Sequence, residues 1–159
     1  MASAFYRLYG RRMLTLSGAT GLDVDLLTDT IAVVFANITA PGTNLYTFAQ
    51  THDFFDDLTP ATAIFGDGGP SIAYNLGEPI LTPTVSTASV FDADNTVLTA
   101  VAAGIGVTLE GEALIIYKIG ASAAASPLIA FIDSFSTITF NGGNVTVQWN
   151  ASGIFQLIP

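Results

Sequence analysis

The chain has 159 residues, of which 50% are hydrophobic and only 11% are charged, and it contains thirteen acids, four basic residues and no cysteine. This length fits one domain, and the lack of cysteine excludes disulfides, thiolate metal sites and a cysteine nucleophile. The net charge of −9 disfavours nucleic acid as a partner, and no apolar run approaches the ~20 residues of a membrane span, so we expect neither nucleic acid nor a membrane as a partner.

Charge divides the chain into a basic start and an acidic body. All the arginines of the sequence lie in its first twelve residues, at Arg7, Arg11 and Arg12. The thirteen acids all follow, against the single Lys118, so the body carries −12 and the start carries +3. The arginines interrupt the apolar core that a secretory signal peptide would need, so we read none. We divide the chain into a basic and aromatic N-terminal arm, residues 1–18, and a single β-rich domain, residues 19–159.

The arm has two interpretations. Ser3 is a candidate N-cap for a short helix whose apolar side holds Phe5 and Tyr9. Gly10 weakens that helix by about 1 kcal/mol, and the alternative is an extended arm that orders only against a neighbour. Because aromatic and arginine side chains are common interface anchors, the arm supplies the candidate residues for an interface with a partner or another subunit: Phe5, Tyr6, Arg7, Tyr9, Arg11 and Arg12.

From Leu22 onward the pattern is that of β-strands. Ile31 to Phe35 form a nearly continuous apolar run, which is typical of a buried strand. One short helical turn is then predicted near residues 51–58, with Thr51 or Asp53 as its N-cap.

Short strands separated by turns dominate the second half of the chain. Eight segments fit this pattern: SIAYNL, ILTPTVSTASVF, TVLTAV, EALIIYKI, PLIAFID, TITF, NVTVQW and GIFQL. The segment TITFNGGNVTVQW predicts a hairpin around an Asn-Gly turn, with Val145, Val147 and Trp149 on one face. Roughly eight to ten short strands predict a mostly β fold, a single-domain antiparallel β-sandwich or barrel-like structure.

His52 is the only histidine, and acids surround it at Asp53, Asp56 and Asp57. Such a group could bind a divalent ion or form part of a catalytic triad. No GxSxG elbow accompanies it, however. We therefore interpret the acids as caps of the short helix and His52 as a surface residue.

Two further acidic motifs have structural interpretations. Residues 92–96, DADNT, resemble the start of an EF-hand calcium loop, but Val97 and Ala103 stand where that loop needs Gly and Glu. We interpret the motif as a turn that uses Asx side chains, with calcium binding left open. Glu110 and Glu112 point to one side of a strand, which favours a solvated strand face over a glycosidase-type carboxylate pair. We predict no enzyme, no catalytic residue, no metal site and no cofactor.

Several segments together resemble a group of small β-rich virion proteins of tailed bacteriophages: LLTDTIAVVFAN, THDFFDDL, VFDADNTVLTAV, EALIIYKIGASAAASPLIAFID and ITFNGGNVTVQWNASGIFQL. The similarity covers most of the chain, is tightest from Val90 to Leu157, and is weaker over residues 5–16 and 61–87. These proteins are generally capsid decoration (cement) proteins or related head and tail structural proteins. The resemblance therefore implies a non-enzymatic part of a virus particle.

The expected function is that of a capsid decoration (cement) protein, which binds the outer capsid shell and stabilises contacts between major capsid protein subunits. The expected partners are the major capsid protein and further copies of this chain, as a dimer or trimer, because 11% charged residues against a typical ~25% leaves faces to cover. The expected location is the outer capsid surface of the virion, after synthesis in the host bacterial cytoplasm.

Two other functions remain open at this point. The first alternative is a phage tail, head-to-tail or fibre-associated structural protein, including a module that binds host glycans. The second is a hydrolase that uses the acids around His52 or the pair formed by Glu110 and Glu112.

Overall fold

The computed structural model of this chain describes residues 4–6, 24–26, 28–39, 45–66, 69–70, 80–85, 90–101 and 110–156. In these residues the protein is mostly β, with antiparallel strand pairs and helix limited to three single turns. The strands are β1 (Ala4–Phe5), β2 (Ile31–Ala36), β3 (Ile64–Gly66), β4 (Gly69–Pro70), β5 (Pro83–Val85), β6 (Val90–Ala93), β7 (Thr96–Leu98), β8 (Glu110–Gly111), β9 (Ala113–Lys118), β10 (Leu128–Ile132), β11 (Ile138–Thr139), β12 (Val145–Val147) and β13 (Phe155–Gln156). The turns are the 3-10 helices η1 (Phe55–Asp57), η2 (Ala61–Ala63) and η3 (Ala123–Ala125). None of the described helices is long and apolar enough to cross a membrane.

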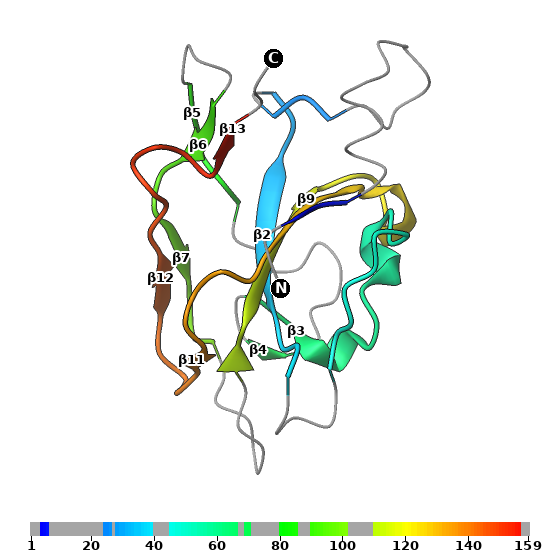
Figure 1. Ribbon diagram of the computed structural model, residues 1–159, viewed down its shortest axis with the longest axis vertical. Helices are drawn as coiled ribbons and strands as arrows, with labels where there is room; N and C mark the ends of the chain where they lie inside the picture. Colours follow the sequence, from blue (N-terminus) through cyan, green and yellow to red (C-terminus); the bar gives the residue numbers. More distant parts are fainter. Residues whose placement is uncertain are drawn as a thin grey trace.

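A six-stranded sheet in the order β1-β10-β9-β2-β3-β4 forms the centre of the molecule, where β2 and β9 run through the middle of Figure 1. Three smaller sheets accompany it: β11 with β8, β12 with β7, and β13-β6-β5. In Figure 1, β7 and β12 lie to the left of the central strands, and β5, β6 and β13 lie above β7 and β12. The described strands close into no barrel. The mostly β, antiparallel class is therefore confirmed, whereas the barrel-like form is not found.

The central strands β2 and β9 are buried on both faces. Every residue of β2 is buried, and so is β9 up to Tyr117. Alternate residues of β2 enter two separate cores, with Val33 and Phe35 in one and Val34 and Ala36 in the other. A strand that is covered on both faces needs apolar residues at every position rather than at alternate ones. The buried strand predicted from Ile31 to Phe35 is thus confirmed.

The two cores lie on opposite faces of the six-stranded sheet. The first core includes side chains from the small sheets, such as Phe91 of β6 and Leu98 of β7. The second core is completed by Tyr46, Phe55 and Leu58, which lie between β2 and β3 in the chain. The small sheets and the connecting segment therefore cover the central sheet from its two sides.

The predicted hairpin around the Asn-Gly turn is wrong. β11 pairs with β8, and β12 pairs with β7, so the two arms of the expected hairpin belong to different sheets. The turn itself is present, with Gly142 at a φ of 86°. Its backbone exchanges hydrogen bonds with the buried Val101, which donates to Gly143 and accepts from Gly142. These long-range partners replace the local pairing that an Asn-Gly turn favours.

The predicted helical turn near residues 51–58 appears as the single 3-10 turn η1. The cap differs from the expectation, because neither Thr51 nor Asp53 supplies it. Instead the Asp57 carboxylate reaches back and accepts the backbone N–H groups of Asp53 and Phe54, at 2.8 and 3.0 Å. Asp57, which lies inside η1, thus accepts the backbone N–H groups of the two residues that precede this turn.

The start of the chain is extended where it is described. Ala4 and Phe5 pair with Phe131 and Ala130 of β10, so a helix that begins at Ser3 is wrong for these residues. Their backbone groups complete the edge of the six-stranded sheet, which an α-helix at this place would leave unpaired. The rest of the arm, including Gly10, lies outside the described residues, and the division at residue 18 stays a prediction.

Candidate functional site

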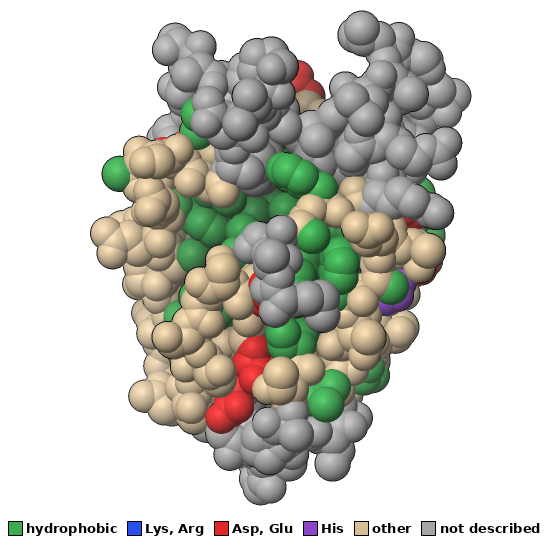
Figure 2. Space-filling model, viewed as in Figure 1, with side chains coloured by type: hydrophobic (Ala, Val, Ile, Leu, Met, Phe, Trp, Pro, Cys, Tyr) green, Lys and Arg blue, Asp and Glu red, His purple; other side chains and the backbone are tan. Residues whose placement is uncertain are grey.

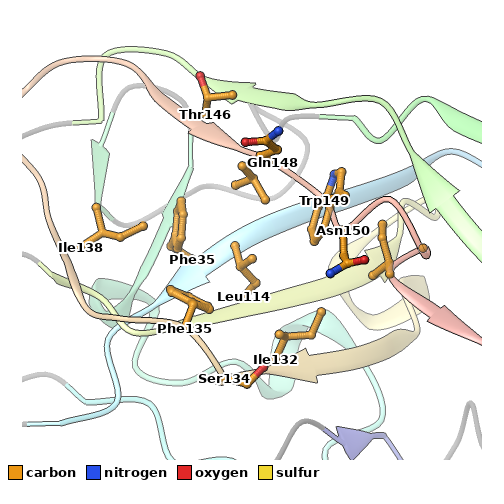
Figure 3. Close-up of a pocket in the computed structure, with 13 residues that line it drawn as sticks. Phe35, Leu114, Ile132, Ser134, Phe135, Ile138, Thr146, Gln148, Trp149 and Asn150 are labelled. Atoms are coloured by element: carbon orange, nitrogen blue, oxygen red, sulfur yellow. The ribbon is translucent and has the colours of Figure 1, made fainter.

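A pocket of about 390 Å³ lies between the six-stranded sheet and the chain around β12. Its floor is formed by two buried side chains, Phe35 of β2 and Leu114 of β9. One wall is formed by Ile132, Phe135 and Ile138, and the other by Val147, Trp149 and Ile154. Figure 3 shows this arrangement, and Figure 2 shows hydrophobic side chains gathered in a hollow between β12 and the central strands. A concave, mostly apolar site of this size is typical of a binding site.

The rim of the pocket is polar but uncharged. Ser134, Thr146, Gln148 and Asn150 line the pocket and are exposed. Asp, Glu, Lys, Arg and His are all missing from the part of the lining that the structure describes. A charged ligand would lose its hydration in this pocket without gaining a partner of opposite charge. The site therefore fits an uncharged ligand.

Trp149 is held in one orientation at its wall. Its indole Nε1 donates a hydrogen bond to Thr96 Oγ1 at 3.1 Å, and Thr96 is buried at the start of β7. On the opposite side, Phe35 packs edge-on against Phe135, with ring centroids 6.2 Å apart. The aromatic surfaces of the pocket are thus fixed by contacts within the protein, and a ligand would meet a preformed site.

Sequence reasoning found one wall of this pocket but not the pocket itself. The alternation of residues 145–150 is confirmed, with Val145, Val147 and Trp149 facing inward and the residues between them exposed. The other wall comes from residues 132–138, which sequence patterns expected to continue into a hairpin with β12. No local signal in the chain shows that these two segments stand apart.

Around the only histidine, the structure shows a row of hydrogen bonds instead of a triad. The Tyr6 hydroxyl lies 2.9 Å from the Tyr46 hydroxyl, which in turn lies 2.9 Å from His52 Nδ1. Tyr6 and Tyr46 are 0% and 1% exposed, and His52 is half-buried rather than a fully exposed surface residue. The row joins the segment after β1 to the segment before η1, so its evident role is to hold these two segments together.

Burial governs the acidity of this tyrosine pair. Burial raises the pKa of Tyr46 to about 12, while the hydrogen bond with Tyr6 lowers it and the nearby Asp57 raises it. Burial also raises the pKa of Tyr6, with further increases from its contact with Tyr46. Both phenols therefore keep their protons at pH values where an exposed tyrosine, with a pKa of about 10, has lost its own.

We expect the stability of the protein to fall as the pH rises from about 10 to about 12. In that window the unfolded chain releases tyrosine protons that the folded chain retains, so the free energy of unfolding decreases with pH, whereas below pH 10 this contribution is fully present. Urea unfolding at a series of pH values measures the effect. Tyr46→Phe should flatten the dependence, and equal slopes for the two proteins would contradict the assignment.

Glu112, one of the acids that could serve a hydrolase, is engaged within the fold. Glu112 is only 7% exposed, and its Oε2 accepts the backbone N–H groups of Ile38 and Thr39 at 2.8 and 2.6 Å. Its Oε1 accepts the Thr39 hydroxyl. The prediction of a solvated face for this glutamate is wrong, because the carboxylate satisfies the backbone at the end of β2. Glu110 is half-buried in β8, so the two carboxyl groups differ in their surroundings.

The calcium-like motif connects two strands that do not pair with each other. Asp92 and Ala93 end β6, and Thr96 begins β7. Asp92 Oδ1 accepts the backbone N–H of the next residue, Ala93, at 2.9 Å. An Asx turn needs the N–H two residues on, so the predicted Asx turn stays a prediction. Across the described ranges, no group of three or more His, Asp or Glu side chains is placed to hold a metal ion.

The expected interface residues are placed only in part. Tyr6 is fully buried in its own subunit, so it offers no surface to a partner and we assign it to the second core. Phe5 is half-buried and packs against the first core. The other candidates lie outside the described residues, and their interface role stays a prediction: Arg7, Tyr9, Arg11 and Arg12.

The described surface carries little charge and some apolar area. Lys118, the only lysine, lies 2.8 Å from the Asp29 carboxylate in a mostly buried ion pair. Among the residues with described side chains, two large apolar ones are exposed, Ile80 at 57% and Val97 at 45%. Figure 2 shows one face on which uncharged side chains and backbone predominate and acids form a small group.

Comparisons with family models, with curated proteins and with solved structures found no match for this chain. The resemblance to virion proteins of tailed bacteriophages therefore stays a prediction.

Proposed function

We propose that this protein is a non-enzymatic structural component of a tailed-bacteriophage virion, a capsid decoration protein on the outer surface of the shell. In this role it binds the major capsid protein and stabilises contacts between neighbouring shell subunits. The proposal includes association with further copies of itself as a dimer or trimer, and a sandwich in which the small sheets form the second layer over the six-stranded sheet.

The proposal rests on the small number of charged residues and on the contacts that several of them make inside the fold. The body has thirteen acids, and its single lysine is paired with Asp29 of the same chain. The carboxylates of Glu112 and Asp57 accept hydrogen bonds from backbone N–H groups. Only 11% of the residues are charged, against a typical ~25%, and these three acids are engaged inside the fold. Fewer ionised groups than usual therefore solvate the surface, which favours a part that other proteins cover.

Burial of apolar area supplies the energy of such a function. Each square ångström of apolar surface removed from water contributes about 25 cal/mol, and association costs offset much of that gain for one modest interface. A shell presents many equivalent sites to a subunit that binds more than one of them at a time, so modest contacts add up over the lattice. The arginine-rich arm complements an acidic surface on the shell or on the next copy.

Removal of residues 1–12 is expected to weaken binding of the purified protein to shells that were assembled without it. The occupancy of the shells by the truncated protein should therefore fall. The deletion removes the +3 charge of the arm together with the two strand residues of β1 and the buried Tyr6. A triple substitution of Arg7, Arg11 and Arg12 by glutamine keeps β1 and isolates the charge. Occupancy measured by gel densitometry on purified particles should fall for both variants, and unchanged occupancy of the triple variant would reject the role of the arm.

Copy number separates this proposal from the tail, head-to-tail or fibre-associated alternative. A decoration protein occurs in numbers comparable to those of the shell subunit, whereas a tail component occurs in far fewer copies. Quantitative mass spectrometry of purified virions distinguishes the two, and a turnover assay with carboxylate variants addresses a hydrolase.

A further inference from the structure

The Asn-Gly turn between β11 and β12 carries a reactive pair of residues at the surface. Asn141, Gly142 and Gly143 are all exposed, and Asn141 is the only asparagine in the chain that a glycine follows. The side-chain amide of an asparagine can be attacked by the backbone nitrogen of the next residue, and a Cβ on that residue hinders the approach. Because Gly142 has no Cβ, its nitrogen can come close to the Asn141 side chain.

A hydrogen bond polarises the carbonyl group that would be attacked. Asn141 Oδ1 accepts the backbone N–H of Gly143 at 3.0 Å. When a nucleophile adds to Cγ, negative charge develops on this oxygen, and a donor at such a distance stabilises that charge. The turn therefore combines an accessible backbone nitrogen with a polarised side-chain carbonyl.

Two other hydrogen bonds restrain the attacking nitrogen. Gly142 N donates to Val101 O at 3.0 Å, and Val101 N donates to Gly143 O at 3.1 Å. Attack requires the turn to open away from Val101. The net contribution of each backbone hydrogen bond is small, so breaking both lowers the rate of attack by about 5–150-fold. The contacts with Val101 thus slow the reaction without preventing it.

Asn150 offers a comparison within the same chain. Its Oδ1 accepts the backbone N–H of Ser152 at 2.8 Å, and both Asn150 and the following Ala151 are exposed. The side-chain carbonyl is therefore polarised in the same way as that of Asn141. The residue that supplies the attacking nitrogen is the difference, because Ala151 has a Cβ.

We propose that Asn141 is a site of spontaneous deamidation in the folded protein. Gly142 N forms a bond to Asn141 Cγ, the Cγ–Nδ2 bond breaks, and ammonia leaves with the proton of Gly142 N. The resulting succinimide ring then takes up one molecule of water. Addition of water at Cγ gives aspartate, whereas addition at the backbone carbonyl carbon of residue 141 gives isoaspartate. This inference is independent of the proposed function.

The two products differ in their effect on the turn. Aspartate leaves the main chain as it was, and its carboxylate can still accept the N–H of Gly143. Isoaspartate puts one additional carbon atom into the main chain, which displaces Gly142 and Gly143 from Val101. Either product adds a negative charge to a chain whose net charge is −9. Isoaspartate also alters the connection between residues 132–138 and 146–150, which form the two walls of the pocket.

The first test compares the two asparagines in the folded, unmodified protein during storage in mildly alkaline buffer. Chymotrypsin cuts after aromatic residues, so it separates peptide 141–149 from peptide 150–155. Mass spectrometry with fragmentation then locates the exchange of an amide for a carboxyl group. The reaction should be about tenfold or more faster at Asn141 than at Asn150. Equal rates at the two residues, or no reaction at Asn141, would overturn the proposal.

A reciprocal pair of variants tests the role of the following residue. Gly142→Ala should stop the reaction at Asn141, and Ala151→Gly should start it at Asn150. A Cβ at Gly142 meets no other atom within 4 Å, but the φ of 86° strains an alanine there. Ala151→Gly carries no such strain, because glycine adopts any backbone conformation. An unreactive Asn150 in folded Ala151→Gly would overturn the proposal even if Gly142→Ala did not fold.

The second test measures what the reaction does to the fold. Ion-exchange chromatography separates the aged forms from the starting protein by their additional charge, and isoaspartyl methyltransferase labels the isoaspartate form. Loss of the two hydrogen bonds to Val101 should lower its midpoint of thermal unfolding by about 4–8 °C relative to Asn141→Asp. Equal midpoints would contradict the inferred release of the turn from Val101.

Discussion

Replacement of Glu112 by alanine is expected to destabilise the protein by about 3–5 kcal/mol, the largest effect among the substitutions considered. The carboxylate accepts two backbone N–H groups and one hydroxyl at the end of β2. Alanine would leave the donors of Ile38 and Thr39 without this partner next to a buried segment. Each buried donor left unsatisfied costs about 1–3 kcal/mol, and hydrogen bonds to a charged group are the stronger ones.

Glu110 provides the matched control for Glu112. It lies two residues earlier, on β8, and it is half-buried. Glu110→Ala should change the free energy of unfolding by about 0.5 kcal/mol or less. Urea unfolding curves of the two variants give the comparison directly. Equal destabilisation by both substitutions would show that the carboxylate of Glu112 does not hold the end of β2.

Replacement of Gly120 by alanine is expected to destabilise the protein by about 3 kcal/mol. A Cβ at this position would overlap the backbone carbonyl of Ala125, whose carbon would lie only 2.7 Å away. Backbone atoms cannot rotate aside as a side chain can. The contact is tight because Ser126 Oγ draws the two ends of the β9–β10 connection together, accepting from Gly120 N at 2.9 Å and donating to Ser122 O at 2.8 Å.

Gly143 serves as the control for Gly120, because a Cβ there would meet only the Asn141 side chain. Gly143→Ala should change the midpoint of thermal unfolding little, whereas Gly120→Ala should lower it by roughly 6–12 °C, the shift that about 3 kcal/mol produces in a domain of this size. Midpoints that fall together would contradict the steric account of Gly120.

Local patterns in the sequence predicted those parts of the fold that depend on burial. The run from Ile31 to Phe35 had to be a strand covered on both faces, because every position is apolar. The alternation of residues 145–150 likewise fixed which side chains face the core. In both places the hydrophobic period alone decides the outcome.

The pairing of strands depends on contacts that no local pattern contains. The Asn-Gly turn forms, but β11 and β12 pair with β8 and β7, because the turn is bound to Val101 far away in the sequence. The same limit hid the role of Glu112, whose backbone donors lie 73 and 74 residues earlier. It also hid the pocket, whose two walls come from segments on either side of the Asn-Gly turn.

The wrong hairpin prediction and the unpredicted pocket concern the same part of the chain. β11 pairs with β8 and β12 pairs with β7, and the pocket over Phe35 and Leu114 lies between residues 132–138 and 146–150. The segments on either side of the Asn-Gly turn stand apart, and the pocket between them has no ionisable group in its described lining.

A reconstruction of the virion at a resolution that shows side chains would test whether this chain is a structural part of a phage shell, as we propose. We expect density for this fold on the outside of the shell, repeated with the symmetry of the lattice. Particles whose shells carry no such density, or density confined to the tail, would contradict it.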